Sequence, residues 1–210
     1  MLVFLLSHVL VSRSRLKPWT IQKIGQSGYL AVYSILSLAL FAWVVVEVIN
    51  AERDVLWLTP GWAYGFATLV SGTGFILIGI GATTHNPFSI SFRSDEFDPA
   101  ALGAVAWIRH PVLWGLTLWG VAHIPANGEW PTLILFAGSA MFGLVGVPAV
   151  ERRQKKRFSP EQWAALRAAP GQFDARARLG AVVGIAIWAG FLYLHPILFG
   201  VDPLASFYRA

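Results

Sequence analysis

Four stretches of the chain are apolar and long enough to cross a lipid bilayer, and this feature constrains the fold more than any other. They cover residues 28–50, 61–83, 130–150 and 179–199. About 20 apolar residues in a helix span a hydrocarbon core of roughly 30 Å. Only 13 % of the residues are charged, about half the share in an average soluble domain. A disordered chain and a single soluble domain are therefore excluded, and residues 1–210 are predicted to form one all-α, polytopic membrane domain.

Two further segments bring the predicted number of transmembrane helices to six, in one bundle. Residues 104–126 are apolar but are interrupted by Arg109-His110-Pro111. Residues 1–12 are too short to span by themselves, and basic residues follow this apolar run instead of preceding it. A cleaved signal peptide has the opposite order and a small-residue cleavage site. We therefore interpret residues 1–12 as a first membrane helix that a late start methionine cuts short, or that is only half inserted.

The basic residues indicate how the six helices are oriented. With the N-terminus outside, only Arg53 and Arg209 of the 16 Lys and Arg residues lie in outer segments, which leaves 14 inside. This split follows the positive-inside rule, so both termini are predicted on the outer side. The net charge of +5 thus reflects membrane topology. The basic run at 151–157 is interpreted as a topology determinant that contacts anionic lipids, and not as a nucleic-acid site.

Histidine is the residue type most able to carry chemistry in this bundle, because an ionisable side chain at membrane depth is costly. The chain has no cysteine, which excludes disulfides, thiolate metal sites and covalent haem attachment. Its five histidines are His8, His85, His110, His123 and His195. A structural role competes for each: His8 and His123 as hydrogen-bond partners between helices, His110 as a helix cap, His195 as an interfacial residue and His85 as a solvated loop residue.

A b-type haem is the cofactor that this set of histidines predicts. Neutral imidazoles from different helices can ligate one iron from both sides. His110 and His123 are 13 residues apart, about 20 Å along one continuous helix, so they cannot share an iron. The second ligand must come from another helix, and His8 is the leading candidate.

Other patterns indicate packing and capping. Gly61/Gly65 and Gly180/Gly184 have the small-xxx-small spacing typical of closely packed membrane helices. The tetrapeptide that begins at Ser159 has the residues of a helix start, with serine as N-cap, proline next and glutamine three residues after the cap. It predicts a short helix around 159–169.

The run IRHPVLWGLTLWGVAHIPANG, residues 108–128, resembles the signature of the NnrU family of bacterial inner-membrane proteins. Ser7-His8 followed by Gly28-Tyr29 resembles the N-terminal region of that family, Asn86-Pro87 its loop after the third helix, and residues 194–203 its C-terminal end. The resemblance implies a location in the bacterial inner membrane and a link to denitrification, where NnrU accompanies nitrite and nitric oxide reductase genes. Its partners would be denitrification or respiratory proteins.

The same landmarks are similar to those of plant and cyanobacterial 15-cis-zeta-carotene isomerases. In those enzymes histidines hold a haem b whose redox state controls isomerisation of a cis double bond in a polyene. The similarity implies that His8 and His123 ligate the haem, that His110 and His195 lie near the site or are structural, and that the substrate is a hydrophobic polyene. The isomerases carry a cysteine three residues before the second motif histidine, where this chain has Gly120. A thiolate-dependent step is therefore excluded.

The depth of the histidines leaves the pairing of His8 open. In a helix, His8 would lie roughly 8 Å above the inner charges, whereas His123 would lie about 18 Å beyond Pro111. Two axial ligands of one iron must lie at similar depth. Depth therefore pairs His8 with His110, and the resemblance pairs it with His123, which is the pairing we favour.

Two other functions are open on the sequence alone. Arg109 and His110 at a helix start, followed by Glu151 and basic residues, resemble isoprenylcysteine and phospholipid methyltransferases, where such residues face S-adenosylmethionine. That resemblance implies a nucleotide pocket that these three residues line and that opens to the cytoplasm. The other alternative is a non-enzymatic assembly factor for nitrite or nitric oxide reductase, in which the histidines would be packing residues.

Overall fold

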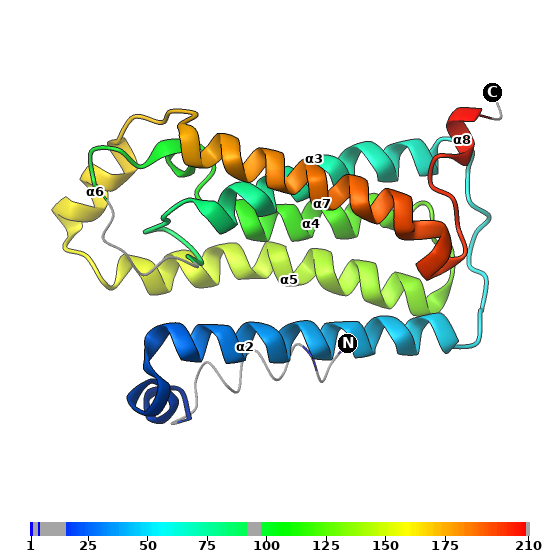
Figure 1. Cartoon of the computed structure of the whole chain (residues 1–210), viewed down its shortest axis with the longest axis horizontal. Coiled ribbons are helices and arrows are strands. Elements are labelled where there is room, and N and C mark those ends of the chain that lie inside the picture. Colours follow the sequence, from blue (N-terminus) through cyan, green and yellow to red (C-terminus); the bar gives the residue numbers. More distant parts are fainter. Residues whose placement is uncertain (2–3, 5–15, 92–97, 209–210) are drawn as a thin grey trace.

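The computed structural model describes residues 1, 4, 16–91 and 98–208, which form an elongated helical bundle (Figure 1). Its helices are α2 (Leu16–Asn50), α3 (Ala63–Thr83), α4 (Pro111–His123), α5 (Trp130–Lys155), α6 (Pro160–Ala168), α7 (Ala175–Phe199) and α8 (Ala205–Tyr208), with a 3₁₀ helix η1 at Gly103–Ala106. Within these ranges, the only pairing of strand type is an isolated bridge between Val55 and Glu129. The predicted all-α fold is confirmed for the described part of the chain.

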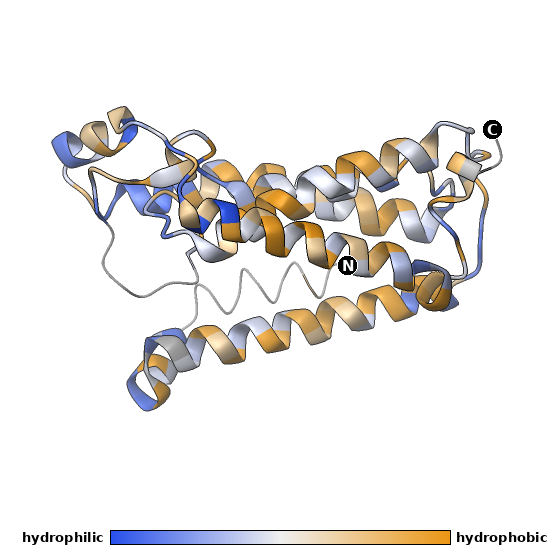
Figure 2. Cartoon of the chain, turned by 45° about the horizontal axis from the view of Figure 1, so that its top comes forward, coloured by the Kyte–Doolittle hydropathy of each residue, from blue (hydrophilic) through white to orange (hydrophobic). Residues whose placement is uncertain are grey.

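Four helices are long and apolar enough to cross a membrane: Gly28–Asn50 of α2, and the whole of α3, α5 and α7. They coincide with the four apolar stretches of the sequence. Hydrophobic residues run along these helices and hydrophilic residues gather at their ends (Figure 2). Large apolar side chains face outward from α2 and α7, where Leu38, Val182 and Ile197 are 69 %, 64 % and 74 % exposed. Such faces suit contact with lipid chains.

The fifth apolar segment differs from its prediction, because residues 104–126 are not one continuous helix. Its helical core, α4, has only 13 residues, about 20 Å of helix against a hydrocarbon core of roughly 30 Å. His110 has φ −127° and ψ 55°, outside the helical region. Pro111 explains the break, since it disfavours the helical conformation of the residue before it and suits the first position of a helix. Six spans are thus not confirmed. Most of the other predicted span, residues 1–12, lies outside the described residues.

The helices pack in a fixed order across the bundle. α3 lies between α4 and α7, and α4 lies in turn between α3 and α5. α2 packs against the far side of α5 (Figure 1). Successive long helices are antiparallel, so α6, the starts of α4 and α7, and the end of α5 share one end of the bundle, here called the inner end. α8 marks the opposite, outer end (Figure 1).

A break in α2 separates its basic start from its apolar span. Gly25 has φ 75° and ψ 171°, a conformation that glycine adopts without the steric cost of a Cβ. The chain turns sharply there (Figure 1). Lys17 and Lys23 therefore lie on a short helical piece beside the inner end, and the straight part of α2 begins after the turn.

Glycines set the spacing of α3 from both of its neighbours. A Cβ on Gly74 would lie 2.8 Å from the carbonyl oxygen of Gly115 in α4, and a Cβ on Gly79 would collide with the backbone of Gly180 in α7. Gly184 is equally close to the backbone of α3 at Phe75. The packing role predicted for Gly180/Gly184 is confirmed. Gly61 and Gly65 do not bring two helix backbones together as predicted. A Cβ on Gly61 would meet no atom within 4 Å, and one on Gly65 would meet only a side chain at 3.6 Å.

Short polar contacts close both ends of the bundle. At the outer end the Leu56 N–H donates to the Gly128 carbonyl over 2.7 Å, and the Thr59 hydroxyl donates to the Ala126 carbonyl over 3.0 Å. At the inner end the predicted short helix is present as α6. Ser159 caps it, with the Gln162 N–H donating to the serine Oγ and the Ser159 N–H donating to the Gln162 side chain.

We predict that Gly79→Val lowers the free energy of unfolding by about 1–3 kcal/mol, because the added isopropyl group must separate α3 from α7. Gly190→Val is the matched control, since a Cβ on this glycine of α7 meets no atom within 4 Å. Denaturant unfolding of the detergent-solubilised variants measures both. Equal stability of the two variants would contradict the close packing of α3 on α7.

Candidate functional site

His123 is the last residue of α4, and its imidazole is fixed by one hydrogen bond. Its Nδ1 lies 2.8 Å from the carbonyl oxygen of Trp119 and 3.5 Å from the Ser71 hydroxyl. Because a carbonyl oxygen only accepts, Nδ1 carries the proton and Nε2 keeps its lone pair. Nε2 has no hydrogen-bond partner among the described residues. The free nitrogen of His123 is therefore the one that a metal could take.

An aromatic layer surrounds the ring of His123. The ring stacks on Phe136 of α5, with centroids 4.7 Å apart and an interplanar angle of 19°. Trp119 lies 5.1 Å from both rings and 5.9 Å from Phe41 of α2. The site of His123 is thus apolar and formed by α4, α5 and α2, with Ser71 of α3 at its edge.

The described residues at the start of the chain pack beside this layer. Phe4 lies 5.6 Å from Phe41, and 6.1 Å from Phe142 of α5. Met1 packs against the neighbouring turn of α5, at Gly138. Met1 and Phe4 thus contact successive turns of α5. His8, the predicted second ligand, lies outside the described residues.

His195 of α7 has the same hydrogen-bond arrangement as His123. Its Nδ1 lies 2.9 Å from the carbonyl oxygen of Val201, which again fixes the proton on Nδ1. Its ring packs on Phe199, with 4.7 Å between the ring centroids. Both imidazoles thus belong to the outer half of the bundle, on different helices.

His110 directly precedes α4 and His123 is its last residue, so the two imidazoles lie at opposite ends of this helix. His110 is 3 % exposed, and neither ring nitrogen has a hydrogen-bond partner. Glu151, near the end of α5, is its closest charged neighbour, with 3.9 Å between Nε2 and Oε2. His110 precedes α4 and lies outside the four candidate spans. Burial lowers its pKa below the ordinary value, the Glu151 carboxylate opposes this shift and Arg109 adds to it.

The segment before α4 is anchored by a loop residue. The Asn86 side chain donates to the Arg109 carbonyl over 2.9 Å, and its oxygen accepts from the Phe88 N–H over 2.9 Å. Asn86 itself is 2 % exposed. The guanidinium of Arg109 lies over the Phe88 ring, 5.7 Å from its centroid. Asn86 therefore fixes the backbone that presents both Arg109 and His110.

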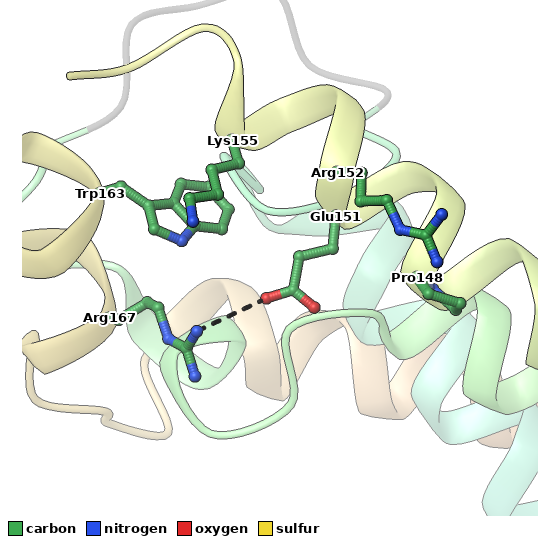
Figure 3. Close-up of a pocket in the computed structure, with 6 residues that line it drawn as sticks. All are labelled: Pro148, Glu151, Arg152, Lys155, Trp163 and Arg167. Carbon is green, nitrogen blue, oxygen red and sulfur yellow. Dashed lines mark ion pairs between the residues drawn. The ribbon is translucent and has the colours of Figure 1, made fainter. Parts of the chain in front are cut away.

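A pocket of about 290 Å³ opens beside Glu151 at the inner end. It is lined by Pro148, Glu151, Arg152 and Lys155 of α5 and by Trp163 and Arg167 of α6. Arg167 and Glu151 point toward each other across it, with 4.0 Å between nitrogen and Oε1 (Figure 3). Glu151 thus contacts His110 on one side and the pocket on the other. Of the three residues that the methyltransferase resemblance places in one pocket, only Glu151 lines this one, and Arg109 and His110 do not.

Sequence reasoning missed several residues of this inner end. Trp163 and Arg167 contribute to the pocket only because α6 folds back on α5. Gln154 is 7 % exposed and donates to the Ser89 carbonyl over 2.7 Å. Sequence reasoning treated the basic run 151–157 as a whole and did not single out Gln154 as a buried residue. In the described ranges no group of three or more His, Cys, Asp or Glu side chains could hold a metal ion.

Gly120, which stands where the isomerases carry a cysteine, packs closely against α5. A Cβ on Gly120 would lie 2.5 Å from the Phe136 carbonyl oxygen and 2.8 Å from the Ala140 nitrogen. Gly120 thus brings α4 against α5 one turn before His123. A larger residue there would require a wider spacing of the two helices.

Comparison with known proteins identifies the family. A family model described as NnrU protein matches residues 1–203. The chain belongs to the NnrU family. The match spans every predicted landmark, including the 108–128 signature that contains His110 and His123. Comparison with the curated proteins and with the solved structures finds no match.

We predict that Asn86→Ala lowers the free energy of unfolding by about 1–3 kcal/mol, because it leaves the part-buried Arg109 carbonyl and the buried Phe88 N–H without this partner. Asn50→Ala, at the exposed end of α2, is the matched control and should change stability by less than about 0.5 kcal/mol. Denaturant unfolding measures both. A stability loss as small as that of the control would show that Asn86 does not anchor Arg109.

Proposed function

We propose that this NnrU-family protein binds a haem b through His123 and a histidine from another helix, in a redox or isomerase-like role. The observation that carries the proposal is the fixed imidazole of His123. Its Nδ1 donates to the Trp119 carbonyl, which leaves Nε2 without a partner in an apolar layer. Metal-ligating histidines typically donate their other ring N–H to a carbonyl or carboxylate.

The surroundings of His123 fit a flat, apolar macrocycle. Phe136 and Trp119 supply aromatic faces, and Phe41 and Phe4 extend the layer toward α2. An apolar site restricts water, and such restriction tunes the potential of a bound iron. When bound, the haem would supply one-electron chemistry. The residues of this chain would orient its axial ligand and exclude water.

Two histidines are candidates for the second ligand. The family resemblance favours His8. His195 is the alternative, because a backbone carbonyl anchors its Nδ1 as one anchors that of His123. His110 is excluded as a partner of His123, since α4 separates the two, but remains a candidate for a structural or neighbouring role.

We predict that protein purified with haem supplied during expression shows a Soret band and, after dithionite, sharp α and β bands. His123→Ala should remove the band or shift it to a high-spin form, because one axial nitrogen is lost. His85→Ala, at the inner end, is the control and should leave the spectrum unchanged. The second ligand is whichever of His8→Ala and His195→Ala reproduces the His123→Ala spectrum.

A flat visible spectrum under these conditions would contradict haem binding. The histidines would then be packing residues, and stoichiometric copurification of a nitrite or nitric oxide reductase component would support an assembly factor. With haem present, the proposed electron partner is a denitrification or respiratory protein, and the proposed alternative substrate is a polyene that enters from the bilayer.

We further propose six membrane helices in the bacterial inner membrane, with both termini in the periplasm and the inner end in the cytoplasm. The proposal counts residues 1–12 and α4 with the four candidate spans. It is supported by charge, because Arg53 is the one Lys or Arg among the described residues that lies at the outer end. The remaining described cations belong to the inner end, as the positive-inside rule requires.

The absence of cysteine makes this topology directly testable. We predict that a membrane-impermeant maleimide labels Arg53→Cys in intact spheroplasts and labels Lys156→Cys only after the membrane is permeabilised. The unsubstituted chain is the blank. Labelling of Lys156→Cys in intact spheroplasts would invert the proposed orientation.

A methyltransferase is the second candidate function, and one observation favours it. His110 lies 3.9 Å from Glu151, and Glu151 lines a pocket that opens at the inner end. Arg109 lies on Phe88 instead of lining the pocket. Calorimetric binding of S-adenosylmethionine that is lost in Arg109→Ala would promote this candidate above haem binding.

A further inference from the structure

The inner-end pocket carries an inference that is independent of haem binding. Its walls come from two helices that meet at the inner end of the bundle, α5 and α6. Pro148 marks its apolar side, while three cations and one acid provide its charge. The pocket lies just where α5 leaves its apolar stretch, which is headgroup depth for a helix that crosses a bilayer.

The charges in this pocket are unequally paired. Glu151 is the one acid in the lining, and both of its oxygens are engaged: Oε1 with Arg167 at 4.0 Å and Oε2 with His110 at 3.9 Å. Arg152 and Lys155, one and four residues after Glu151, form no ion pair with a described residue. Within the described ranges, two cations therefore line the pocket without an acidic partner.

A buried histidine lies directly behind Glu151. His110 is 3 % exposed, and both of its ring nitrogens lack a hydrogen-bond partner. Buried polar groups of this kind are rare in folded proteins and require an explanation. Its Nε2 lies 3.9 Å from Oε2 of Glu151. His110 is thus a close polar neighbour of the one acid in the lining, although it does not line the pocket itself.

We propose that this pocket binds an anionic group of phosphate type, with Lys155, Arg152 and Arg167 as its hydrogen-bond donors. Charge-assisted hydrogen bonds from Arg and Lys to phosphate are short and strong. Trp163, which is 5 % exposed, supplies the apolar wall on the α6 side. A volume of about 290 Å³ admits a headgroup or one phosphate-bearing moiety.

The phosphate can come from two sources with the same chemistry. One is the headgroup of an anionic phospholipid in the adjoining leaflet, since basic pockets at the cytoplasmic face of membrane proteins take such groups. The other is a soluble phosphate compound. Binding of short-chain phosphatidylglycerol but not of inorganic phosphate would assign the lipid, and binding of inorganic phosphate would assign the soluble source.

The test uses the full chain in a non-ionic detergent and measures both ligands by calorimetry. Phosphatidylcholine of equal chain length, which is zwitterionic and has no net charge, is the reference. We predict that Arg152→Gln with Lys155→Gln weakens binding by about fivefold or more. Arg153→Gln with Lys156→Gln is the matched control, because these neighbours lose the same charge but do not line the pocket. It should weaken binding by less than about twofold.

A second variant tests the sign of the ligand charge. Glu151→Gln removes the one acid of the pocket and should tighten anion binding. Weaker binding in Glu151→Gln would show that the carboxylate receives a cation, and would overturn the proposal. An equal loss in the pocket and control pairs would overturn it too, since only net surface charge would then act. The proposal is also overturned if neither phosphatidylglycerol nor inorganic phosphate binds at about 10 mM, a concentration at which even weak complexes form.

Discussion

The close approach of α3 to α4 and α7 is the contact on which the rest of the structure depends. Backbone meets backbone at Gly74 and Gly115 on one side and at Gly79 and Gly180 on the other. In lipid there is no hydrophobic drive to bring apolar helices together, so van der Waals contact between small residues must do so. This packing sets the depth of α4, a helix too short to cross the membrane alone.

The position of α4 separates two kinds of chemistry. At its outer end, His123 presents Nε2 into an aromatic layer of α4, α5 and α2. At its inner start, His110 faces Glu151 beside a basic pocket. The first environment is apolar and suits a cofactor, while the second is polar and near the membrane surface. The 108–128 signature thus places one histidine at each end of α4, in two environments that lie too far apart to hold the same metal or molecule.

The sequence predicted the spans and the family well, because both depend on local information. Apolar runs of membrane length coincide with α2, α3, α5 and α7, and the 108–128 signature agrees with the family match. The capping residues at Ser159 predicted α6 for the same reason. The prediction of one helix over 104–126 was wrong, because the helix α4 begins only at Pro111. The proline itself was the signal in the sequence for this start.

The sequence by itself determined an all-helical membrane protein, its four apolar spans, the distribution of its basic residues and the set of histidines. Each follows from composition or spacing along the chain. Only the tertiary structure decided which histidine nitrogens are free, that Glu151 lies between His110 and Arg167, and that α6 folds onto α5 to form a pocket. These features join residues far apart in sequence, and their spacing depends on how closely glycine backbones let the helices approach.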